Sequence, residues 1–167
     1  MIQIPDGVGV DVSGSVVTVS GPKGSVSKKF SARVVIEKSG SNTLEVKGAE
    51  KEKALVNTTE ALIKNMIKGV TEGYSKRLKI LYAHFPATME VKGNLILIKN
   101  FLGEKNPRKA KIMGGSTKVE VKGQQLTVTG VDKEAVGQTV ANLKAVLKIK
   151  DKDPRVFQDS VYEIIEG

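Results

Sequence analysis

Side chains that could carry out catalysis or bind a metal are scarce in this chain of 167 residues. It has no cysteine and one histidine, His84, which excludes thiolate nucleophiles, disulfides, the common zinc sites and paired-histidine acid–base schemes. A serine–histidine–aspartate triad would need His84, which lies beside Phe85 and Pro86 and is better explained as a linker or packing residue. Asp151 and Asp153 lie among basic residues, which favours charge balance over acid–base work. We therefore expect no enzyme activity, no cofactor and no metal.

Cations are the abundant functional groups. The chain has 27 lysine and arginine residues against 18 acidic ones, and its formal net charge is +9. This balance favours an acidic partner such as RNA, DNA or an anionic membrane. The apolar runs are strand-sized and the start of the sequence lacks signal-peptide features, so we expect neither a membrane span nor secretion. The basic residues gather in four clusters: Lys23, Lys28, Lys29 and Arg33; Lys76, Arg77 and Lys79; Lys99, Lys105, Arg108, Lys109 and Lys111; and Lys144, Lys148, Lys150, Lys152 and Arg155.

Two local sequences could contact phosphate. The segment Ser20–Gly24 looks superficially like a phosphate loop, but it lacks the GxxxxGK[ST] spacing and is better interpreted as a turn. In the segment Asn100–Ala110, apolar residues, a glycine and Pro107 precede Arg108 and Lys109, so a stiffened backbone could hold these cations against phosphates. Aromatic residues make up only 4% of the chain and do not alternate with basic ones. Recognition of folded, duplex-rich RNA through its shape and backbone is therefore favoured over base stacking.

The elements that must position these side chains occur twice. The pattern of Val10–Val19 recurs in Met89–Ile98, where apolar residues alternate up to a glycine-led pair and then resume, as in two strands joined by a tight hairpin. Another hairpin and an apolar helical pattern follow in each copy. The first copy is predicted to have strands at 9–11, 16–19, 33–37 and 43–46 and a helix over 50–71, and the second to have strands at 118–121 and 125–129 and a helix over 136–147.

Strands that cluster before a helix, rather than alternating with helices, indicate an α+β fold. We predict two tandem, structurally similar domains, each with a mainly antiparallel sheet packed against one helix. Their predicted bounds are residues 1–81 and 82–167, and the second domain carries the basic loop and the basic tail. Each copy is long enough for a small domain with a core of its own.

Five parts of the chain together make up a pattern that is specific for one protein family. They are the turn 20–24, the helical residues 58–59 with 61–74, the loop 100–108, the segment 132–138 and the ending 153–159. In these parts, and over essentially its whole length, the chain resembles the large-subunit ribosomal protein L-six family in its archaeal and eukaryotic-like form. One departure is Ser160 and Val161, where the family pattern has glycine and then isoleucine. This departure concerns the contact made by the tail.

The resemblance implies a structural, non-catalytic constituent of the large ribosomal subunit, located in the cytoplasm within the ribosome. It implies binding to large-subunit ribosomal RNA of the 23S type near the sarcin–ricin loop and the stalk base. The protein would stabilise RNA structure there, close to translation factors and neighbouring ribosomal proteins and away from any membrane. The loop and the tail match the family's RNA-facing second domain, and the expected phosphate ligands are Lys99, Lys105, Arg108, Lys109, Lys111, Lys148, Lys150, Lys152 and Arg155.

Two other classes of function stay open from the sequence. A protein-binding module could use an exposed sheet edge, and its binding would resist salt. An enzyme would need a convergent polar pocket, for which the residues of this chain offer little material.

Overall fold

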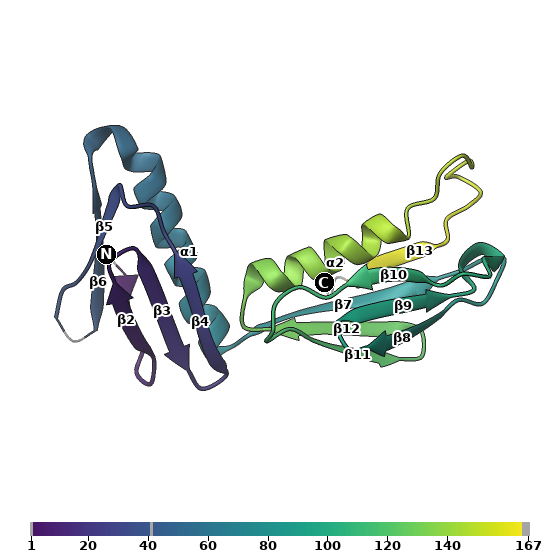
Figure 1. The fold of residues 1–167 in the computed structure, drawn as a ribbon, viewed down its shortest axis with the longest axis horizontal. Helices are drawn as coiled ribbons and strands as arrows, with labels where there is room; N and C mark the ends of the chain where they lie inside the picture. The colour runs from purple at the N-terminus through teal and green to yellow at the C-terminus, as the bar shows by residue number, and fades with distance from the viewer. Residues whose placement is uncertain (1, 41, 165–167) are drawn as a thin grey trace. The chain divides into compact units, whose positions relative to one another are not determined.

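The computed structural model describes residues 2–40 and 42–164, which form two compact units (Figure 1). The first unit contains the residues up to Gly73 together with Val131–Lys133, and the second begins at Tyr74 and contains the rest. Every strand pair in the described part of the chain is antiparallel. The predicted α+β class and the predicted pair of similar domains are therefore confirmed.

The first unit has two three-stranded sheets and one long helix. One sheet has the order β2-β3-β4 and the other β1-β6-β5. The elements are β1 (Ile2–Gln3), β2 (Gly9–Ser13), β3 (Val16–Gly21), β4 (Gly24–Lys29), β5 (Val34–Lys38), β6 (Thr43–Gly48), a 3-10 turn (Glu50–Glu52) and α1 (Lys53–Thr71). Residues from both sheets and from α1 form a single apolar core.

Helix α1 forms where the apolar residues recur at three- and four-residue steps. Ile63, Met66, Ile67 and Val70 are buried on one face, which contacts β3 and β6. The helix ends because Gly73 adopts a left-handed conformation with φ of 77°, and its N–H donates to the carbonyl of Lys68 at 3.2 Å. The last turn of the helix is thus closed by a backbone geometry that glycine adopts at little cost.

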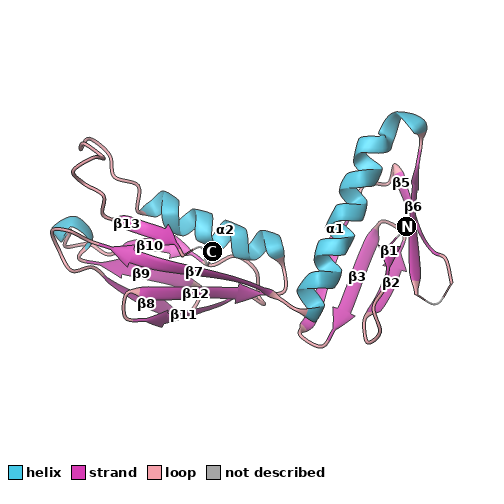
Figure 2. Ribbon diagram, turned by 180° about the vertical axis from the view of Figure 1, so that it is seen from behind, coloured by secondary structure: helices cyan, strands magenta, loops and turns pink. Residues whose placement is uncertain are grey.

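The second unit has the same kind of construction with one additional strand. Its sheets have the orders β10-β9-β8 and β11-β12-β7-β13, and α2 lies along them (Figure 2). The elements are β7 (Tyr74–Leu81), β8 (Thr88–Lys92), β9 (Leu95–Lys99), a 3-10 turn (Phe101–Gly103), β10 (Arg108–Lys111), β11 (Lys118–Lys122), β12 (Gln125–Gly130), α2 (Lys133–Val146) and β13 (Ser160–Glu163). Both sheets and α2 contribute to one core.

The repeated hairpins have the predicted geometry. The loop between β2 and β3 has Gly14 at its first position, and the loop between β8 and β9 has Gly93 there, with φ of 60° and 57°. A type II′ turn takes glycine at that position, and its twist matches that of the two strands.

The pairing of β7 explains where the domains divide. In the first unit, β1 pairs with β6, and in the second unit β7 pairs with β12 in the same way. Thus β7 is the opening strand of the second repeat, and the division falls between Gly73 and Tyr74 rather than after residue 81. The sequence pattern did not locate this strand because three of its residues belong to a basic cluster.

Strands β4, β10 and β13 were also not predicted. Each has few apolar residues, and its pairing is provided by a neighbour: β4 pairs with β3, β10 with β9 and β13 with β7. The predicted loop Asn100–Lys111 is consequently a 3-10 turn followed by a short connection and the edge strand β10.

Candidate nucleic-acid interface

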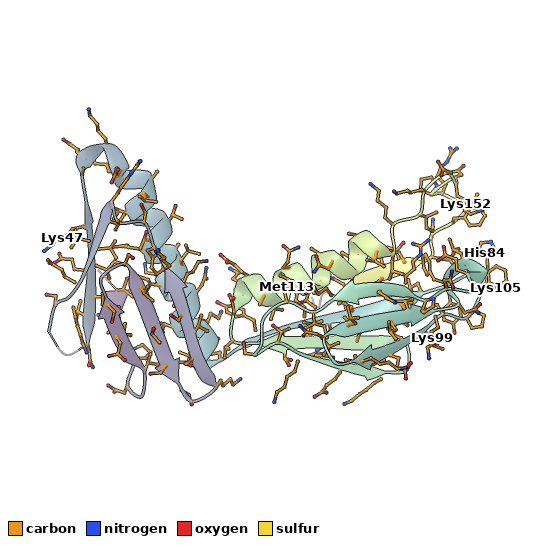
Figure 3. The ribbon with its side chains drawn as sticks, viewed as in Figure 1. Lys47, His84, Lys99, Lys105, Met113 and Lys152 are labelled. Atoms are coloured by element: carbon orange, nitrogen blue, oxygen red, sulfur yellow. The ribbon has the colours of Figure 1, made fainter. Side chains whose placement is uncertain are left out.

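The second unit brings the two predicted basic segments, the loop after β9 and the tail after α2, to one hollow. The hollow has a volume of about 560 Å³. It is lined by Leu102, Glu104, Arg108, Ala145, Val146, Lys148, Ile149, Lys150 and Lys152. Figure 3 shows Lys105 and Lys152 at the same end of this unit. Residues about forty positions apart in the sequence therefore form one basic region.

The guanidinium of Arg108 is engaged inside this region. Its Nε and Nη2 donate to the two carboxylate oxygens of Glu104 at 2.8 and 2.5 Å. Its Nη1 donates to the carbonyl of Val146 at 2.7 Å and lies 3.4 Å from that of Lys148. The guanidinium carbon also lies 4.6 Å from the centre of the Phe101 ring. The sequence predicts Arg108 to be a phosphate ligand, whereas the structure gives most of its donors partners within the protein.

The ion pair changes the acidity of both groups. The hydrogen bond from Arg108 holds the pKa of Glu104 below its ordinary value. The same hydrogen bond raises the pKa of Arg108 above its ordinary value. Both groups therefore stay charged and paired at neutral pH.

Several of the predicted lysines are exposed around this hollow and on the strand beside it. Within residues 2–40 and 42–164 they have no ion-pair partner, so their charge is open to solvent. They are Lys105, Lys109, Lys111, Lys148 and Lys150.

Strand β10 divides the predicted residues between two faces. Ala110 is buried, so Lys109 and Lys111 project to the opposite, exposed face of the sheet β10-β9-β8. Lys99 at the end of β9 is exposed, and its ammonium lies 2.6 Å from Glu90 of β8. The Lys99 ammonium lowers the pKa of Glu90. Lys99 is therefore an ion-paired cation, whereas Lys109 and Lys111 are not.

The tail after α2 makes local contacts of its own. Arg155 binds both carboxylate oxygens of Asp153, with its Nε 3.2 Å and its Nη2 3.1 Å from them. The Arg155 hydrogen bonds hold the pKa of Asp153 below its ordinary value. Lys152 lies over the ring of Phe157, with its ammonium 4.7 Å from the ring centre. The charge balance predicted for Asp153 is thus present in the structure.

His84 packs against the same tail. Its ring stacks on that of Phe157 with centres 4.9 Å apart, and its Nδ1 lies 3.4 Å from the buried carboxylate of Asp159. Asp159 also accepts a hydrogen bond from the backbone N–H of Ala83 at 3.2 Å. The predicted packing role of His84 is confirmed.

The glycine turn Ser20–Gly24 has a structural contact. The N–H of Lys23 donates to the carbonyl of Val70 at 3.0 Å, and the ammonium of Lys23 donates to the carbonyl of Glu72. Lys23 therefore binds the carbonyl end of α1, where the helix dipole favours a cation.

Among residues 2–40 and 42–164, no group of three or more acidic or histidine side chains could hold a metal ion. In the same part of the chain, neither helix combines the length and the apolar character needed to cross a membrane.

Comparison with known proteins decides the family. The family model described as "Ribosomal protein L6" matches residues 4–73 and 85–160. The chain belongs to the ribosomal protein L6 family. A "Large ribosomal subunit protein uL6" from Methanobrevibacter smithii is 48% identical to it, with 98% of this chain and 93% of the relative aligned. Proteins of the same description from Staphylothermus marinus and Methanosarcina mazei are 48% and 47% identical, over 96% of this chain and 90% and 93% of theirs.

Membership of the L6 family agrees with the duplicated fold. The two matched segments correspond to the two units, and the similar relatives are mostly archaeal, as the resemblance seen in the sequence indicated. The family is a structural, non-enzymatic component of the ribosome.

Proposed function

We propose that this protein binds large-subunit ribosomal RNA near the sarcin–ricin loop and the stalk base, through the exposed lysines of its second unit. The coarser role follows from the family: the protein is a structural, non-enzymatic constituent of the large ribosomal subunit in the cytoplasmic ribosome. In this proposal it stabilises RNA structure where translation factors act, with neighbouring ribosomal proteins as further partners.

The observation that carries the proposal is the gathering of lysines around the hollow in the second unit. Lys148 and Lys150 line it, are exposed and lack an ion-pair partner in the described residues. Lys152 lines it too and keeps its charge exposed beside Phe157. Ammonium groups of this kind contact phosphates without reading sequence, and so they suit a partner recognised by shape.

The experiment compares two RNAs across a salt series. The purified protein is titrated with a large-subunit RNA fragment that contains the sarcin–ricin region and with a plain duplex of equal length. We expect the fragment to bind more tightly and its affinity to fall steeply with salt, because phosphate contacts release counterions. Equal binding to both RNAs would contradict the proposed location, and an absence of binding would contradict RNA recognition by the isolated protein.

Two variants that remove the same charge from different parts of the chain test which surface binds the RNA. The triple variant Lys148→Gln, Lys150→Gln and Lys152→Gln removes three cations from the hollow. Replacing the exposed residues Lys38, Lys51 and Lys64 of the first unit by glutamine removes the same charge elsewhere. We expect the first variant to reduce the slope of log K against log salt by about 0.9 for each lost duplex contact, and the second to leave the slope nearly unchanged.

A further inference from the structure

We propose that Arg108 is a positioning residue, which holds the RNA-binding lysines in place by joining the loop before β10 to the end of α2, and that it does not itself bind a phosphate. The inference rests on the proposed RNA-binding function of the second unit. It differs from the phosphate-ligand role that the sequence predicts for this residue.

The N–H donors of Arg108 are largely used within the protein, which supports this role. A guanidinium has five N–H donors in a planar fork. Nε donates to Glu104, Nη1 has the carbonyls of Val146 and Lys148 as partners, and one N–H of Nη2 donates to Glu104. A single N–H of Nη2 is left, so Arg108 cannot present the two parallel donors with which arginine binds a phosphate bidentately. Its side chain is 23% exposed, between the loop and the helix end.

The partners of Arg108 show what it holds. A helix ends with carbonyls that have no N–H partner within the helix, and a cation placed there is favoured by the helix dipole. The carbonyl of Val146 is at this end of α2, and the chain continues from it into Lys148 and Lys150. By binding this carbonyl, Arg108 fixes the point from which the basic tail leaves the helix.

Through its pairing with Glu104, Arg108 also holds the loop before β10. Glu104 and Arg108 are four residues apart, and their fork closes the segment between them, which contains Lys105. The Phe101 ring packs beneath the guanidinium and is itself almost fully buried in the core. One side chain therefore connects the core, the position of Lys105 and the start of the tail.

Substitution of Glu104 tests the proposal, because the phosphate-ligand role and the positioning role of Arg108 predict opposite changes in RNA affinity. If Arg108 were a phosphate ligand, Glu104→Gln would release its guanidinium and remove a repelling charge, so RNA would bind more tightly. If Arg108 is a positioning residue, Glu104→Gln breaks the fork, the lysines lose their fixed arrangement, and RNA binds more weakly although the net charge has become more positive.

The matched control is Glu120→Gln. Glu120 is an exposed acid on β11 of the same unit, it has no ion-pair partner in the described residues, and its substitution changes the charge by the same amount. We expect Glu120→Gln to leave RNA binding unchanged or slightly tighter. We expect Glu104→Gln to weaken it by about tenfold or more, the effect of losing one charged hydrogen-bond pair.

A double-mutant cycle separates positioning from a general loss of structure. Glu104→Gln is combined with Lys148→Gln, Lys150→Gln and Lys152→Gln, and the dissociation constant of the RNA fragment is measured for each of the four proteins. If Arg108 acts through the tail lysines, Glu104→Gln has much less effect when they are absent. A full, additive effect in that background would overturn the proposal.

Arg108→Lys gives a second readout that does not depend on Glu104→Gln folding well. It keeps the positive charge but cannot form the fork, so a positioning role predicts weaker binding and a lower salt slope, because the displaced lysines make fewer phosphate contacts. Circular dichroism at the assay temperature establishes that each variant is folded. Tighter binding of Glu104→Gln, or wild-type affinity of Arg108→Lys, would overturn the positioning role alone, whereas a wild-type protein that does not bind the RNA would overturn the proposed function.

Discussion

Lys144 of α2 donates a hydrogen bond to Glu163 of β13, with Nζ and Oε1 2.8 Å apart. Lys76 of β7 binds the other oxygen of this carboxylate at 2.9 Å. One acidic side chain thus joins the final strand to the helix and to its neighbouring strand. We expect Glu163→Gln to lower the free energy of unfolding by about 1 kcal/mol in urea denaturation. Glu120→Gln, which removes an exposed acid without such partners, should leave it unchanged.

The effect of Glu163 should depend on pH. The hydrogen bond from Lys144, followed by that from Lys76, lowers the pKa of Glu163. Because the pKa is lower in the folded state, the unfolded state binds more protons at acidic pH. The stabilisation is therefore complete above the unfolded value of about 4.3 and is lost as the pH falls through the folded value. The difference between wild type and Glu163→Gln should shrink in this acidic range, and a constant difference there would contradict the contact.

Substitution of Gly73 should lower the stability of the protein. With φ of 77° it lies in the left-handed region, where a Cβ atom clashes with the backbone. We expect Gly73→Ala to lower the free energy of unfolding by about 1 to 2 kcal/mol. Gly137 in α2 is the control, because a Cβ there would meet no atom within 4 Å. Gly137→Ala should stabilise the protein by about 0.5 to 1 kcal/mol, and equal effects of the two substitutions would be incompatible with this explanation.

Asp159 should contribute to the order of the tail. Its carboxylate is buried and accepts a hydrogen bond from the N–H of Ala83. Asp159→Ala would leave this N–H without its partner, so we expect a loss of about 1 to 3 kcal/mol in the free energy of unfolding. Asp159→Asn keeps an acceptor oxygen and should cost less. If both variants unfold at the same urea concentration, the hydrogen bond to Ala83 is not what stabilises the tail.

Much of the fold could be predicted from the sequence because it depends on local patterns. The glycine-led pairs at Gly14 and Gly93 required tight hairpins, and the apolar stripe that includes Ile63 and Val70 required a helix. The strand β10 could not be recognised in this way, because Ala110 is its one buried residue and its pairing depends on β9. The strand β7 could not be recognised for a related reason, since its charged residues outnumber its buried ones.

The candidate site could be predicted as segments but not as individual side chains. Counting charges identified the loop and the tail, and the position of Asp151 and Asp153 among basic residues indicated local charge balance. The partial burial of Arg108 and the exposure of Lys109 depend on the register of β10, which fixes the face that each residue occupies. The contact between Arg108 and Val146 joins residues thirty-eight positions apart. No local pattern could have shown it.

Substitutions on the exposed face of β10 test whether RNA binds at this face or responds only to the total charge of the second unit. Lys109 and Lys111 are exposed there without an ion-pair partner in the described residues, so Lys109→Gln with Lys111→Gln should leave the urea midpoint unchanged. If these lysines contact phosphates, the slope of log K against log salt for the ribosomal RNA fragment should fall by about 1.8. The control replaces Lys118 and Lys122, two exposed lysines of β11, and removes the same charge from the same unit. A smaller change in slope for the control would locate RNA on the β10 face, whereas equal changes would show that only the total charge of the unit matters.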